Sequence, residues 1–303
     1  MKKIINDPTA VVDEMLEGLA YIHSDLVYRV EGFDIIARKS EKTGKVGLIS
    51  GGGSGHEPSH AGFVGEGMLS AAICGAVFTS PTPDQVLQAI KEADEGAGVF
   101  MVIKNYSGDI MNFEMAQEMA EMEGIEVASV VVDDDIAVED SLYTQGRRGV
   151  AGTILVHKIL GNAARAGKSL TEIKALADEL VKHIHTVGLA LSGATVPEVG
   201  KPGFVLADDE IEFGIGIHGE PGYRKEKMQP SKDLAKELVE KLSQSFELKS
   251  GKKIGILING MGATPLMEQY VFAADVANLL ADAGVEVVYK KLGNYMTSID
   301  MAG

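Results

Sequence analysis

The sequence has few of the residues that mark an oxidising compartment or a membrane protein. Its 303 residues include a single cysteine, Cys74, and no tryptophan. One cysteine cannot form an internal disulfide, which is typical of a reducing compartment. No apolar stretch approaches the ~20 residues of a membrane span, and the N-terminus turns polar too early for a signal peptide. We therefore expect a cytoplasmic protein with no membrane contact.

Positive charge is scarce as well. The chain has 28 Lys and Arg residues against 44 Asp and Glu residues, which gives a formal net charge of −16. A surface of this kind repels phosphate backbones, so nucleic-acid binding is not expected. A small anionic ligand remains compatible with the sequence, because backbone N–H groups can bind one locally.

The fold class follows from the alternation of apolar and amphipathic segments. Hydrophobic residues make up 45% of the chain, which is enough for a large core. Short strands alternating with helices of about a dozen residues predict an α/β fold with largely parallel or mixed sheets covered by helices. The length favours two domains over a single large one. A segment rich in Gly, Ser, Thr and Pro around 187–203 marks the boundary between α/β domains at 1–187 and 188–303.

The pattern predicts these elements in chain order: helix 8–23, strands 33–38, 46–50 and 69–77, helix 83–93, strand 98–103, helix 109–122, strand 126–132, helices 150–166 and 170–187, strand 211–217, helix 231–246, strand 253–259, helix 264–283 and strand 285–290. Residues 294–300 lead toward one more strand, so the sequence leaves open whether its C-terminal end is complete.

The most informative stretch is glycine-rich and follows the strand at 46–50. It reads Gly-Gly-Gly-Ser-Gly-His-Glu-Pro over 51–58. Glycines after a strand let the backbone approach a ligand closely, and a helix start behind them would aim free N–H groups at it. His56 adds an imidazole, which exchanges protons near neutral pH. The stretch therefore predicts a binding turn with its own acid or base.

Nucleotide and metal motifs fail on inspection. The stretch 51–56 does not fit G-x-G-x-x-G, because His56 stands where the last glycine belongs, and it lacks the lysine of a P-loop. Gly167-Lys168-Ser169 ends like a Walker A motif but lies between two predicted helices. No histidine pair has zinc-ligand spacing with a carboxylate, and the aspartates at 133–135, although suited to Mg²⁺, are more typical of a solvated loop. We expect this chain to bind neither a metal nor a nucleotide cofactor.

Two further segments place polar side chains where strands end. Asp109 follows the strand at 98–103, and the carboxyl ends of strands are where open α/β sheets bind ligands. His218 follows the predicted strand at 211–217. Each residue alone also fits a strand-end turn facing solvent, and Asp109 also fits a helix N-cap. The three segments together favour a site, because all lie at equivalent strand ends.

These segments resemble a known family. The stretches 51–58, 104–109 (Lys-Asn-Tyr-Ser-Gly-Asp) and 214–220 (Gly-Ile-Gly-Ile-His-Gly-Glu) are similar to the dihydroxyacetone-binding K subunits of dihydroxyacetone kinases. The similarity runs over essentially the whole chain.

The resemblance implies roles for individual residues. It implies that His218 attacks the ketone of dihydroxyacetone and holds it as a covalent hemiaminal. It implies that His56 is the general base on the hydroxyl that receives the phosphoryl group, and that Asp109 orients or shares that proton. The remaining substrate-binding positions that it implies are Gly53, Ser54, Gly55 and Lys104.

The resemblance also implies partners. In this family ATP or ADP and Mg²⁺ lie on an all-helical L subunit, which in phosphotransferase-system enzymes is recharged by a phosphohistidine-bearing M subunit. The sequence ends before an L domain, so we expect a separate K subunit, homodimeric and active only with its partners. One alternative is a dihydroxyacetone-sensing paralogue in transcriptional control, against which the presence of both His56 and Asp109 argues. A sugar-phosphate enzyme with its own phosphate-binding loop is a weaker alternative.

Overall fold

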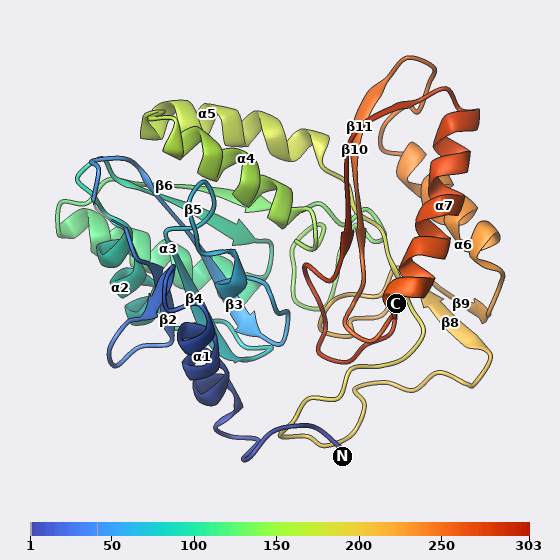
Figure 1. Ribbon diagram of the computed structural model, residues 1–303, viewed down its shortest axis with the longest axis horizontal. Coiled ribbons are helices and arrows are strands. Elements are labelled where there is room, and N and C mark those ends of the chain that lie inside the picture. Colours follow the sequence, from blue (N-terminus) through green and yellow to red (C-terminus); the bar gives the residue numbers. More distant parts are fainter. Residues whose placement is uncertain (1, 41) are drawn as a thin grey trace.

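A computed structural model describes residues 2–40 and 42–303 (Figure 1). The first part of the chain forms a six-stranded sheet with the order β1-β2-β4-β3-β5-β6. Strands β4, β3, β5 and β6 are parallel, whereas β1 and β2 form an antiparallel edge. The strands are β1 (Val27–Arg29), β2 (Ile35–Arg38), β3 (Gly47–Ser54), β4 (Ala71–Val77), β5 (Val99–Lys104) and β6 (Val127–Val132).

Helices cover both faces of this sheet. Their bounds are α1 (Val11–Ile22), α2 (Pro83–Ala93), α3 (Ser107–Met122), α4 (Thr153–Arg165) and α5 (Leu170–Leu180). Side chains alternate across a strand, so Phe100 and Val102 of β5 join the core under α1, α4 and α5. Met101 and Ile103 join the core under α2 and α3. Burial on both faces explains why β5 is a continuous apolar run up to Lys104.

The second part of the chain carries two smaller sheets. Strands β7 (Leu189–Ala190), β8 (Glu210–Phe213) and β9 (Arg224–Lys227) form an antiparallel sheet, and β10 (Lys253–Asn259) and β11 (Glu286–Gly293) form a parallel pair. Helices α6 (Ser231–Ser243) and α7 (Leu266–Asp282) pack against them. The α/β fold class is thus confirmed. The boundary at 187/188 falls between the short 3₁₀ helix η2 (Val181–His183) and β7, and the division into two domains stays a prediction.

Residues 51–54 of the glycine-rich stretch belong to a strand, and bends and turns begin only at Gly55. The prediction that the turn starts at Gly51 and leads into a helix is wrong. Strand β3 continues through the glycines to Ser54 and pairs with β4. Only the three-residue 3₁₀ helix η1 (Ala61–Phe63) follows. The glycines serve close packing: a Cβ on Gly51 would lie 2.5 Å from the carbonyl oxygen of Ile73.

Other predicted boundaries shift. The strand predicted at 211–217 ends at Phe213, and the helix predicted at 170–187 ends at Leu180. Residues 294–300 are turns and irregular backbone instead of the start of a strand.

Two of the three aspartates expected in a solvated loop, Asp134 and Asp135, are buried instead, whereas Asp133 is exposed as expected. Asp134 accepts hydrogen bonds from the backbone N–H groups of Val150 and Gly152, both at 2.8 Å. Asp135 pairs with the fully buried Arg148 at 2.8 Å. Their carboxylates thus hold the segment that leads into α4.

Cys74 lies buried in β4, where burial raises the pKa of its thiol far above the ordinary value. The thiol therefore stays protonated and acts as a small core side chain. Over residues 2–40 and 42–303, no helix has the length and hydropathy of a membrane span. The same residues contain no cluster of acidic, His and Cys side chains that could hold a metal ion.

Candidate active site

Two histidines from distant parts of the chain meet beside the carboxyl ends of β3 and β5. His56 follows β3, His218 follows β8, and their Nε2 atoms lie 3.0 Å apart. The ring of Phe78 stacks on His56 at 5.1 Å between centroids and meets His218 edge to face. Tyr106 meets His218 edge to face from another side at 4.7 Å. Asp109 lies in the first turn of α3, directly after β5.

His56 is held by the C-terminal segment of the chain. Its Nδ1 donates a hydrogen bond to the carbonyl oxygen of Thr297 at 2.7 Å, and the ring is 1% exposed. The N–H of Ile299 donates to the carbonyl oxygen of Gly55 at 2.7 Å. This second bond holds the backbone beside His56 against the C-terminal segment. Burial, followed by the electrostatic effects of His218 and of Lys104, lowers the pKa of His56 well below its ordinary value. His56 is therefore a neutral imidazole.

His218 is held by Glu220. The Nδ1 atom of His218 lies 3.0 Å from Oε1 of Glu220, and its backbone N–H donates to Oε2 at 2.8 Å. Burial by itself raises the pKa of Glu220, but the hydrogen bonds from His218 outweigh it and leave that pKa below its ordinary value. Glycine is needed two positions before His218, because a Cβ on Gly216 would lie 2.0 Å from Oε2 of Glu220.

These contacts fix the number of protons on the two imidazoles. The carbonyl oxygen of Thr297 can only accept, so Nδ1 of His56 carries a proton. Glu220 is ionised, so Nδ1 of His218 carries one too. Two unprotonated nitrogens 3.0 Å apart would repel each other, so one more proton lies between the Nε2 atoms. The two imidazoles therefore form a hydrogen bond with each other, held by the Thr297 carbonyl oxygen on one side and by Glu220 on the other.

Asp109 and Lys104 form a buried ion pair beneath the glycine-containing end of β3. The Nζ atom of Lys104 lies 3.5 Å from Oδ2 of Asp109, and their side chains are 1% and 5% exposed. The hydroxyl of Ser80 donates to Oδ1 of Asp109. A Cβ on Gly52 would lie 2.4 Å from Nζ of Lys104, so glycine is needed above the ammonium.

The remaining predicted positions line the end of β3. The hydroxyl of Ser54 donates to the carbonyl oxygen of Gly75 at 2.7 Å, so it is engaged inside the sheet. A Cβ on Gly53 would lie 2.5 Å from the backbone nitrogen of Thr79, and one on Gly55 would lie 2.8 Å from the Phe78 ring. Their contacts with a substrate stay predictions.

Sequence reasoning missed several residues of the site. Glu220 stands two positions after His218 in the stretch 214–220, and a carboxylate so near a histidine is a signal that the sequence offers. Thr297 acts through its carbonyl oxygen, for which a side chain gives no signal. Phe78 and Tyr106 are ordinary apolar residues in sequence and acquire their role from packing against the two imidazoles.

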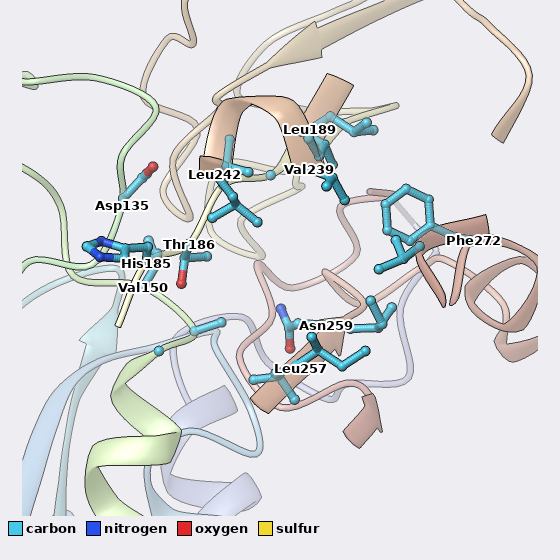
Figure 2. A pocket seen from close by; sticks show the side chains of 18 of the residues that line it. Asp135, Val150, His185, Thr186, Leu189, Val239, Leu242, Leu257, Asn259 and Phe272 are labelled. Carbon is cyan, nitrogen blue, oxygen red and sulfur yellow. The ribbon is translucent and has the colours of Figure 1, made fainter. Parts of the chain in front are cut away.

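A large cavity lies elsewhere. It has a volume of about 1000 Å³ and is lined mainly by apolar side chains of β10, α6 and α7. Figure 2 shows Leu242, Leu257 and Phe272 around it, with His185 at one side. None of His56, Asp109 and His218 lines this cavity, so size does not identify the site; the convergence of polar groups does.

The sequence is similar to proteins of one group. Residues 17–303 match the Dak1 domain family. The chain is 70% identical over 302 residues to the "PTS-dependent dihydroxyacetone kinase, dihydroxyacetone-binding subunit DhaK" of Lactococcus lactis, covering 100% of this chain and 91% of that protein. It is 62% identical over 303 residues to the DhaK subunit of "PTS-dependent dihydroxyacetone kinase 1" of Listeria innocua, covering 100% and 92%.

Two further similarities bear on the choice between catalysis and sensing. The chain is 46% identical over 304 residues to the "DhaKLM operon coactivator DhaQ" of Lactococcus lactis, covering 99% of this chain and 92% of that protein. The solved structure of the dihydroxyacetone kinase from C. freundii in complex with AMP-PNP and Mg²⁺ superposes with a TM-score of 0.89 at 33% identity. It covers 99% of this chain and 56% of that one.

Proposed function

Because the chain belongs to the Dak1 family, we propose that it is the dihydroxyacetone-binding subunit of a dihydroxyacetone kinase supplied by the phosphotransferase system. The family expected from the sequence is thereby confirmed. The observation that carries the proposal is the contact between His56 and His218, with Glu220 behind His218. A nucleophile, a base and an orienting carboxylate are placed together, as covalent catalysis requires.

The geometry suggests how the ketone becomes bound. The proton between the two imidazoles moves to Nε2 of His56, which frees the lone pair on Nε2 of His218. That lone pair attacks the carbonyl carbon and forms an N–C bond, while the π electrons of the C=O bond move to oxygen. The oxygen takes the proton from His56, which completes the hemiaminal hydroxyl. Formation of the N–C bond leaves the positive charge on the His218 ring, which keeps its Nδ1–H bond to Glu220.

The same sequence of steps prepares the phosphoryl acceptor. After the adduct forms, His56 is neutral again and its Nε2 lone pair faces the bound triose. It then takes the proton from the hydroxyl that receives the phosphoryl group, and Asp109 orients or shares that proton. Glycerol has no carbonyl and cannot form the adduct, so the covalent bond also selects the substrate.

The phosphoryl donor is supplied by other proteins in this proposal. ATP or ADP and Mg²⁺ lie on a separate L subunit, and an M subunit with a phosphohistidine recharges the ADP. The absence of a complete P-loop motif in this chain supports this division. We further propose that the subunit is a cytoplasmic homodimer, for which sedimentation of the purified chain is the direct test.

The test is reconstitution. The chain with L and M subunits, a phosphohistidine donor and dihydroxyacetone is expected to form dihydroxyacetone phosphate, and the chain alone with ATP and Mg²⁺ is expected to form none. Robust phosphorylation by the chain alone would contradict the division of labour.

The similarity to the coactivator DhaQ supports a second candidate, a dihydroxyacetone sensor in transcriptional control. A sensor needs only the ketone-binding histidine, whereas this chain also places His56 against His218 and Asp109 at the end of β5. The same reconstitution separates the two: a sensor binds dihydroxyacetone but yields no phosphorylated product with any combination of L and M subunits.

A further inference from the structure

Three buried side chains, joined in a row by hydrogen bonds, lead away from the site beneath β3. Nζ of Lys104 lies 3.1 Å from Nε2 of His60, and Nδ1 of His60 lies 3.0 Å from Nε2 of His157. The three residues are 1%, 4% and 0% exposed. Lys104 ends β5, His60 precedes η1, and His157 lies on α4. The proposed chemistry uses neither imidazole.

The contacts of Lys104 set the direction of the first hydrogen bond. An ammonium group carries three N–H donors and no acceptor. Around Nζ lie the carbonyl oxygen of Gly51 at 3.3 Å, Nε2 of His60 at 3.1 Å and Oδ2 of Asp109 at 3.5 Å. Each donor has one acceptor, so Nε2 of His60 must be unprotonated.

The tautomers of both histidines follow from this. Burial, followed by the charge of Lys104, lowers the pKa of His60 well below its ordinary value and that of His157 to about 3. Both rings are therefore neutral, and the single proton of His60 lies on Nδ1, which donates to Nε2 of His157. The proton of His157 is then on its Nδ1, a buried atom with no hydrogen-bond partner among the described residues. Each hydrogen bond in this series therefore has a single direction: Lys104 donates to His60, and His60 donates to His157.

We propose that Lys104, His60 and His157 form a positioning chain for Asp109. All three donors of Lys104 are occupied by protein acceptors, so Lys104 acts through Asp109 instead of through a free N–H of its own. His60 keeps the ammonium turned toward the carboxylate, and His157 keeps His60 in the tautomer that accepts. The effect on turnover rests on the proposed function, because Asp109 acts on the substrate proton in that scheme.

The tautomers can be measured without any activity. Protein labelled with ¹⁵N in its histidine rings is examined by long-range ¹H–¹⁵N correlation between pH 6 and pH 8. The signals of the two rings are assigned by their loss in His60→Gln and His157→Gln. We expect both rings to be neutral and protonated on Nδ1. Protonation of His60 on Nε2, or on both nitrogens, would contradict the proposed hydrogen bonds from Lys104 to His60 and from His60 to His157.

Kinetics then separate positioning from a general structural role. His60→Leu removes the acceptor and is expected to lower turnover with L and M subunits about tenfold, because a hydrogen bond to a charged group is lost. His60→Gln can still accept from Lys104 and donate to His157, so it should restore turnover to within about threefold. The exposed His23→Gln is the control and should change nothing. Formation of the His218 adduct should remain intact in all three.

A double-mutant cycle with Asp109→Asn gives the decisive comparison. If His60 acts through Asp109, His60→Leu should cause no further loss in the Asp109→Asn background. Additive losses, or loss of the adduct together with turnover, would refute the positioning role. If the wild-type protein neither forms the adduct nor supports turnover, the proposed function has failed instead. The tautomers alone then decide whether Lys104, His60 and His157 are joined as proposed.

Discussion

The Nε2 atom of His56 lies 3.0 Å from the Nε2 atom of His218, although the two residues are 162 positions apart in the sequence. Their other ring nitrogens are held by the Thr297 carbonyl oxygen and by Glu220. In the proposed function, a proton held between the two Nε2 atoms must leave His218 before that ring can attack a carbonyl. His56 is the group placed to receive it. In the proposed function, this relationship makes the two histidines one catalytic unit.

Replacement of His56 by Asn should separate the two roles of this unit. Turnover with L and M subunits is expected to fall at least ~100-fold, because the general base is gone. The adduct should still form, although more slowly, because His218 and Glu220 are untouched. Loss of the ¹³C ketone signal of labelled dihydroxyacetone on protein addition measures the adduct, and coupled product formation measures turnover. Unchanged turnover would remove His56 from the mechanism.

Glu220→Gln tests the carboxylate behind His218. The charge that stabilises the imidazolium adduct is removed while the shape is kept, so affinity for dihydroxyacetone should fall at least ~10-fold. Glu212→Gln is a matched control, since Glu212 is also buried and its carboxylate accepts the N–H of Gly222 at 2.7 Å. Equal losses in the two variants, measured by calorimetric titration, would show that Glu220 serves the loop and not the adduct.

Gly52→Ala tests the close packing over the buried ion pair. The new methyl group would lie 2.4 Å from Nζ of Lys104, which can move away only by lengthening its contacts with three acceptors. We expect a loss of about 1–3 kcal/mol in the free energy of unfolding and a loss of turnover. Gly18→Ala on α1 meets nothing within 4 Å and should stabilise the helix by up to ~1 kcal/mol. Denaturant titration distinguishes the two, and unchanged stability and turnover in Gly52→Ala would contradict the packing argument.

The buried His157 predicts a dependence of stability on pH. Burial lowers the pKa of His157 in the folded state from its ordinary value to about 3. As the pH falls below the unfolded value of about 6.5, the unfolded chain binds the proton first, so stability is lost progressively toward pH 3. The slope is up to ~1.4 kcal/mol per pH unit from this residue.

His157→Leu should therefore flatten the decline of unfolding free energy between pH 6 and pH 4, whatever its effect at pH 7. The exposed His23→Gln should leave the slope unchanged. A slope in His157→Leu equal to that of the wild type would show that His157 is already charged in the folded state.

Much of the site could be predicted because strand ends converge. The apolar runs at 46–50 and 98–103 mark two parallel strands, and the carboxyl ends of such strands lie at one edge. The prediction of a strand at 211–217 groups His218 with that edge, and the family resemblance agrees. However, β8 ends at Phe213 and belongs to another sheet, and no periodicity indicates which loop of the second part of the chain folds back.

The errors have physical causes as well. Glycines 51–53 suggested a turn, but their missing side chains are required by neighbouring backbone and by Lys104 within a sheet. His157 sits at a core position of α4, where a sequence pattern cannot tell a packed imidazole from a hydrogen-bonded one. The carbonyl oxygen of Thr297 belongs to irregular backbone, which periodicity does not describe.

The most direct test of the account is a crystal structure of the chain soaked with dihydroxyacetone. The account predicts continuous density from Nε2 of His218 to the central carbon of the triose, with that carbon tetrahedral and the two imidazoles moved apart to admit it. An intact planar ketone beside an unmodified His218, or a triose bound away from His218, would contradict it.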